Sequence, residues 1–100
     1  DSIVRAVNLL VESKGGISFV DGERELLLPL PVAGLMSDKD GYEVANQYSS
    51  INSAVIGSGS ALAAPFMTLS FMALLVIPAL KLSDRGLFDG TTFSFTSLFE

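Results

Sequence analysis

The stretch ISFVDGERELLL, residues 17–28, predicts a β-hairpin. Apolar and polar residues alternate along ISFV, residues 17–20, as they do in a half-buried strand. Asp21-Gly22 follows, and Asp-Gly between two apolar runs is a strong hairpin signal because both positions tolerate positive φ. The return strand is predicted at 23–28. Pro29 and Pro31 lack a backbone N–H, so we expect the chain to leave the sheet or run along its edge beyond Leu28.

A helix is predicted before the hairpin, over residues 2–14. Its apolar residues recur at the spacing of one helical face. Ser2 is suited to cap its first turn, and Gly15-Gly16 to end it. The residues of this face are Ile3, Val4, Val7, Leu10 and Val11.

A second helix is predicted over residues 42–56, where apolar residues again follow a helical stripe. Asp40 with Glu43 resembles a capping box, and Ser37 or Asp38 could cap the helix one turn earlier. The start of this helix is therefore open by about three residues. GSGS, residues 57–60, is typical of a flexible connector.

Residues 61–80 contain no charged side chain, over the length of a membrane span. Pro65 and Pro78 leave twelve residues between them, which as a helix would measure roughly 18 Å, against the ~30 Å of a bilayer core. We therefore expect no membrane span, but a buried core helix at 66–74 that leads into a strand. The side chains expected to reach the core are Phe66, Leu69 and Met72, or Phe71 and Leu74.

The last twenty residues predict turns and strands. Turn signals occur at 83–86 and 89–90, and residues 92–96 alternate as a half-buried strand does. Six of the seven phenylalanines lie at or after Phe66, so the C-terminal third is expected to supply most of the aromatic core. The order of elements predicts one α+β domain over residues 1–100, a two-layer fold with helices packed on one face of a mixed or antiparallel sheet.

Composition excludes several function classes. The net charge is −5 and no cluster of Lys or Arg occurs, so nucleic acid is not expected as a partner. The chain has no cysteine and no histidine, which removes disulfides, zinc–thiolate sites and histidine-based catalysis. Asp38-Lys39-Asp40-Gly41 lacks the rest of a calcium loop. From the residues alone, no catalytic or metal-binding residue is predicted.

The first residues are Asp1-Ser2 rather than Met, so we expect the chain to be a piece of a longer protein. No basic segment precedes an apolar run at the start, and no signal peptide is expected. The lack of cysteine fits a cytoplasmic location.

Three stretches occur in a fixed order: LPLPVAGLMSD at 28–38, PFMTLSFMAL at 65–74 and VIPALKLSDRGLFD at 76–89. Together with AVNLLVESKGGISFVDGERELLLPLP before them, they resemble the C-terminal domain of bacterial adenine deaminases, members of the amidohydrolase superfamily. The resemblance covers residues 3–90.

The resemblance implies a parent enzyme of purine salvage that hydrolyses adenine to hypoxanthine and ammonia. It implies a divalent metal of the manganese or iron type, held by histidines of a catalytic barrel upstream, and no cofactor in this chain. The expected role of this chain is structural, and its expected partner is the catalytic barrel of the same parent chain. The resemblance is also compatible with formation of a homo-oligomer. The chain alone is expected to be inactive. The alternative is a free-standing, non-catalytic interaction module with the same fold.

The loop at 29–38 is the candidate site. Two prolines and Gly34 predict a shaped loop rather than a slack one. The resemblance is densest here, which suggests that the loop faces the active site of the parent; a rigid connector without such contact is the alternative. The candidate residues are Gly34, Leu35, Met36, Ser37 and Asp38.

Overall fold

The computed structural model describes residues 1–99, which form two compact units, Asp1–Pro65 and a second unit from Phe66 on. The predicted order of elements is confirmed, and so is the α+β class with antiparallel pairing. The single domain over 1–100 stays a prediction. The helices are α1 (Ser2–Glu12), α2 (Gly41–Gly57) and α3 (Pro65–Met72), and the strands are β1 (Gly16–Asp21), β2 (Arg24–Pro29), β3 (Leu80–Ser83), β4 (Gly86–Asp89) and β5 (Ser94–Thr96).

The predicted hairpin forms from β1 and β2, but its turn lies one residue later than expected. Asp21 pairs with Arg24, so the two turn residues are Gly22 and Glu23. Gly22 has φ 58°, the sign that a type II′ turn requires at its first position. The Asp21-Gly22 signal therefore located the hairpin but not its register.

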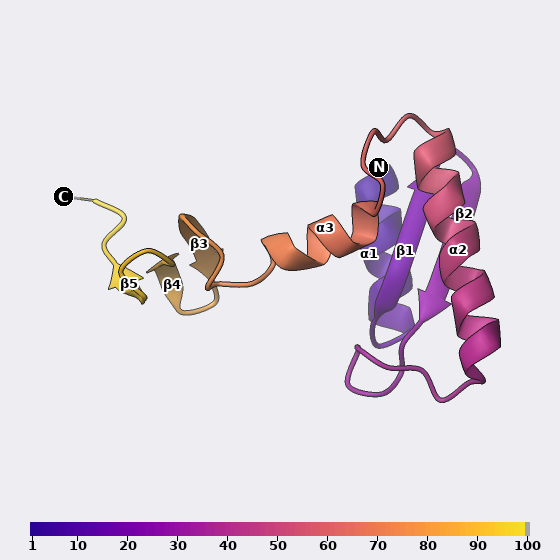
Figure 1. Cartoon of the computed structure of the whole chain (residues 1–100), viewed down its shortest axis with the longest axis horizontal. Helices are drawn as coiled ribbons and strands as arrows, with labels where there is room; N and C mark the ends of the chain where they lie inside the picture. The colour runs from indigo at the N-terminus through magenta and orange to yellow at the C-terminus, as the bar shows by residue number, and fades with distance from the viewer. Residues whose placement is uncertain (100) are drawn as a thin grey trace. The chain divides into compact units, whose positions relative to one another are not determined.

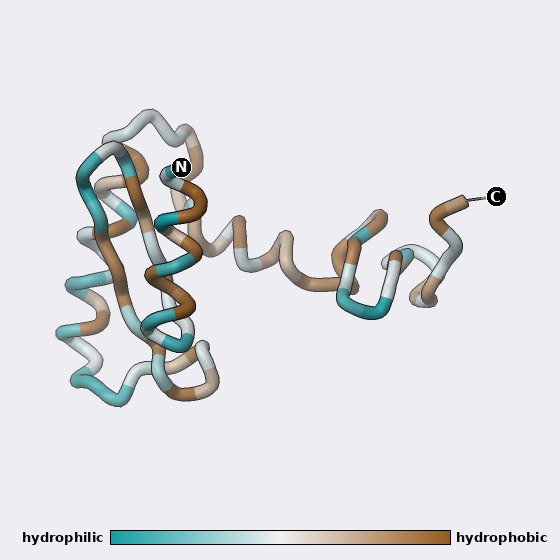
Figure 2. The backbone as a smooth tube through the Cα atoms, turned by 180° about the vertical axis from the view of Figure 1, so that it is seen from behind, coloured by the Kyte–Doolittle hydropathy of each residue, from teal (hydrophilic) through white to brown (hydrophobic). Residues whose placement is uncertain are grey.

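The hairpin lies between α1 and α2 (Figures 1 and 2). The Ser18 hydroxyl donates to the carbonyl of Ala6 in α1. Side chains alternate along a strand, so Asp21 points to the other face, where its carboxylate accepts a hydrogen bond from Ser58 at the end of α2. The two helices thus cover opposite faces of the hairpin, whereas the sequence led us to expect them on one face.

The core of the first unit lies between β2 and α2. Leu28 is 2% exposed and Ile51 is 3% exposed, with Ala54 buried beside them on the same helix. On the opposite face, Arg5 of α1 donates from Nε to Glu25 of β2 at 2.8 Å. A half-exposed ion pair of this kind contributes little stability, so the α2 side holds most of the apolar contact.

Helix α1 ends at Glu12, two residues before the predicted end. The amide of Lys14 donates to Val11 and that of Gly15 to Leu10, the two bonds of a Schellman motif. Lys14, with φ 59°, takes the left-handed position that we assigned to a glycine. The left-handed residue that ends α1 is therefore Lys14, and neither Gly15 nor Gly16 is needed for that position. At the other end, Asp1 and not Ser2 is the N-cap residue.

Asp40 caps α2, which settles the start of this helix. Its Oδ1 accepts from the amide of Tyr42 at 2.9 Å and from that of Glu43 at 3.4 Å. Capping by Ser37 or Asp38 is therefore wrong, because the helix begins at Gly41 and both lie too far upstream.

In the second unit, α3 does form, but the prediction of a buried core helix is wrong. Its apolar residues surround the helix rather than forming a stripe, and the described residues of its own unit leave it largely exposed. Leu69 is 66% exposed and Phe71 and Met72 are each 49% exposed. No helix within residues 1–99 has the length and apolarity needed to cross a membrane.

The second unit contains a three-stranded antiparallel sheet in the order β3-β4-β5. Both predicted turns are present. At the second turn the Thr91 amide donates a hydrogen bond to the Asp89 carboxylate, and this bond, with those of Thr92, lowers the pKa of Asp89. The prediction that phenylalanines of the C-terminal third supply most of the aromatic core is confirmed only for Phe88, which is buried. The rings of Phe93 and Phe95 contact Phe88 edge-on, but these two residues are 68% and 52% exposed.

The cap of α2 provides a direct stability prediction. Asp40→Ala removes the acceptor for two helix amides and should lower the free energy of unfolding of the first unit by about 1 kcal/mol. Asp38→Ala, which removes an exposed aspartate two residues away, is the matched control. Chemical denaturation followed by circular dichroism measures both. Equal losses for the two variants would contradict the assignment of the cap.

Candidate functional site: the loop of residues 30–38

The loop after β2 folds back against the turn that follows α1. The amide of Leu30 donates to the carbonyl of Gly15 at 3.1 Å. A Cβ atom at Gly15 would lie 2.4 Å from the Cα atom of Gly34, a separation at which one backbone must move. Glycine at position 15 therefore permits direct backbone contact between this turn and the loop.

The tip of the loop is a small closed turn. Val32 and Met36 form an antiparallel bridge, with N–H···O distances of 3.0 and 3.1 Å. Between them, Ala33 and Gly34 have φ 57° and 72°. These backbone bonds, together with the contact to Gly15, give the loop a defined shape, as two prolines and Gly34 predicted.

The five candidate residues lie together at or beside this tip, but they differ in exposure. Leu35 is 77% exposed and Met36 is 58% exposed. Gly34 and Ser37 are half-buried, and Ser37 Oγ accepts from the amide of Lys39 at 3.2 Å, while Asp38 is exposed. The part of the loop offered to a partner is therefore apolar. Whether it faces an active site stays a prediction.

The charged groups beside the loop serve the start of α2. Lys39 Nζ donates to Glu43 Oε1 at 2.7 Å, and this hydrogen bond, reinforced by the charge of Glu43, raises the pKa of Lys39. Glu43 also accepts from Gln47. Lys39, Glu43 and Gln47 are thus hydrogen-bonded to one another at the surface of α2 and its start.

The residues of this chain do not fit a catalytic metal. Its sequence contains neither histidine nor cysteine, and within residues 1–99 no three acidic side chains come together. Divalent metals of hydrolases are held by several such ligands at once. Residues 1–99 therefore offer no set of ligands for the metal that the resemblance implies.

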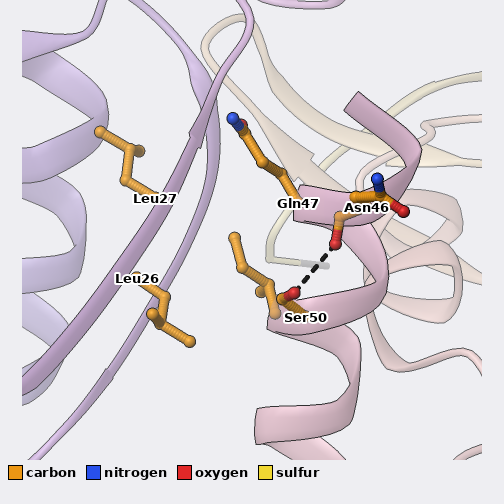
Figure 3. A pocket seen from close by; sticks show the side chains of 6 residues that line it. Leu26, Leu27, Asn46, Gln47 and Ser50 are labelled. Carbon is orange, nitrogen blue, oxygen red and sulfur yellow. Dashed lines mark hydrogen bonds between the residues drawn. The ribbon is translucent and has the colours of Figure 1, made fainter. Parts of the chain in front are cut away.

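A hollow between β2 and α2 was not predicted from the sequence. Its volume is about 230 Å³, below the ~300–1,000 Å³ typical of small-molecule pockets. Leu26 and Leu27 point to opposite sides of β2, and Gln47 extends from α2 toward the hairpin (Figure 3). Gln47 Oε1 has no hydrogen-bond partner among residues 1–99. The lining residues are Leu26, Leu27, Asn46, Gln47, Ser50 and Ile51.

Known proteins similar to this chain agree with one another. Residues 1–94 match the family model described as the adenine deaminase C-terminal domain. Adenine deaminase of Sulfurovum sp. is 60% identical over 94 residues, covering 93% of this chain and 18% of that protein. Adenine deaminase of Methanosarcina acetivorans is 59% identical over 97 residues, which cover 97% of this chain and 18% of that protein. Adenine deaminase of Salinibacter ruber is 55% identical over 100 residues, which cover 99% of this chain and 18% of that protein.

The chain thus spans about 18% of the length of the curated relatives it matches. No solved structure matches it. The family match runs through both compact units, and the relatives align with nearly every residue. The chain belongs to the adenine deaminase C-terminal domain family.

Proposed function

We propose that this chain works as the non-catalytic C-terminal part of an enzyme that hydrolyses adenine. Water replaces the exocyclic amine, so that adenine and water give hypoxanthine and ammonia. The observation behind this proposal is the match of residues 1–94 to the family model, together with relatives named adenine deaminase, one of them 60% identical over 94 residues.

The chemistry belongs, in this proposal, to the other four-fifths of such an enzyme. A divalent metal of the manganese or iron type would be held there by histidines of a catalytic barrel, since the residues of this chain do not fit a metal. The role left to this chain is contact with the barrel. A place in purine salvage, a cytoplasmic location and assembly into homo-oligomers belong to the same proposal.

The loop of residues 30–38 is the part that we propose to face the catalytic barrel. Its backbone is held by Gly15 and by the Val32–Met36 bridge, so little conformational entropy remains to be lost on contact. Leu35 and Met36 extend from it into solvent. A rigid loop that presents apolar side chains is suited to line the mouth of a site made by another part of the protein.

A graft tests the function. In the Sulfurovum enzyme, the 94 residues that match this chain are exchanged for the matching residues of this chain, and ammonia release from adenine is measured. We expect turnover within about tenfold of the parent enzyme, a barrier change of at most 1.4 kcal/mol, and no turnover from the 100-residue chain alone. A folded graft without activity would contradict the proposal and favour a free-standing module.

Met36→Ala in the grafted enzyme tests the loop. If the loop lines the mouth of the site, losing this exposed side chain should lower kcat/KM for adenine by roughly tenfold, about 1.4 kcal/mol, without lowering the melting temperature.

The matched control is Met67→Ala in α3, the same truncation at a side chain 54% exposed, against 58% for Met36. It should leave kcat/KM unchanged. Wild-type kinetics for Met36→Ala would restrict the loop to a connecting role.

A further inference from the structure

Helix α1 turns its most apolar side away from the hairpin. Figure 2 shows hydrophobic bands that recur along this helix. The residues that form this side, called the α1 outer face below, expose 51–81% of their surface. They are Ile3, Val4, Val7 and Val11, exposed by 81%, 58%, 51% and 70%.

The inner side of α1 is the one that meets the hairpin, and it is more polar. It includes Arg5, which pairs with Glu25, and Ala6, whose carbonyl accepts from Ser18. Its larger apolar residues are Leu9 and Leu10, both half-buried. A helix at the surface of a complete domain normally buries its apolar stripe and exposes its polar side. In α1 the most apolar side is exposed instead, and no residue of the first unit covers the outer face.

The residue types on the outer face suit an interface. All four are β-branched, and such side chains have few rotamers to lose when a partner immobilises them. Valine and isoleucine are also poorer helix formers than leucine or alanine. Their presence at exposed positions therefore adds nothing to the stability of the helix itself.

The size of the outer face limits the occupant. Four partly exposed aliphatic side chains offer on the order of 300 Å² of apolar surface, whereas a stable interface between separate molecules buries about 800 Å² on each partner. A tethered partner has no comparable translational entropy to lose, so a smaller surface suffices. A second copy of the chain is thus disfavoured as the occupant.

We infer that the α1 outer face docks on an apolar surface of the remaining part of the adenine deaminase polypeptide to which this domain is joined. The relatives are more than five times as long as their match to this chain, which leaves ample protein for such a surface. The inference rests on the proposed function for the identity of the partner, and it adds a second contact besides the loop.

Thiol labelling tests the docking without relying on catalysis. The chain has no cysteine, so Val7→Cys introduces a single thiol on the outer face. Ser49→Cys, at an exposed position on α2, is the control. Alkylation rates are measured by mass spectrometry of the peptide concerned, in the 100-residue chain and in the grafted Sulfurovum enzyme. Val11→Cys repeats the test one helical turn on.

We expect the thiols at positions 7 and 11 to react at least about tenfold more slowly in the grafted enzyme than in the chain alone, with position 49 unchanged. Equal rates at position 7 in both proteins would overturn the docking. Slowing in the chain alone that increases with its concentration would also overturn it, in favour of a second copy. Protection in a graft that folds but does not release ammonia would uphold the docking and contradict only the proposed function.

Discussion

The backbone contact between Gly15 and Gly34 is the constraint on which the first unit depends. At Gly15 a side chain would meet the Cα atom of Gly34, and at Gly16 it would lie 2.3 Å from the carbonyl oxygen of Leu28. Both glycines also have positive φ, 121° and 148°. The turn after α1 can therefore lie directly against the end of the hairpin and against the loop, and a side chain at either position would force a backbone to move.

The consequences of this contact reach both faces of the hairpin. Gly15 also closes the turn that ends α1, since its amide donates to the carbonyl of Leu10, and β1 begins at the next residue, Gly16. Gly15 fixes the exit from β2 as well, since Leu30 donates to its carbonyl. From there the loop can lead only to Asp40 and the capped start of α2, which closes the core over Leu28. One close approach thus links the candidate loop to the packing of the unit.

The sequence predicted what local rules determine. Alternation located the first hairpin strand and the Asp21-Gly22 signal the return strand, helical spacing located α1 and α2, and Asp40 was among the candidate caps. It could not predict burial, because periodicity identifies apolar residues and not what covers them. For this reason α3 was expected in a core, although Leu69 is 66% exposed. The shape of the candidate loop followed from its prolines and Gly34, but its contact with Gly15 is tertiary and leaves no mark on local pattern.

Adding one methyl group at the close approach between Gly15 and Gly34 tests whether this contact positions the loop for function. Gly15→Ala in the grafted enzyme should displace the loop, whereas Gly59→Ala changes a glycine that also has positive φ but has nothing within 4 Å. The measurement is kcat/KM for adenine, with hydrogen exchange to confirm that both variants remain folded. We predict at least a tenfold loss for Gly15→Ala, about 1.4 kcal/mol, and little change for Gly59→Ala. Wild-type kinetics for Gly15→Ala with a displaced loop would contradict the role proposed for the loop at the active site.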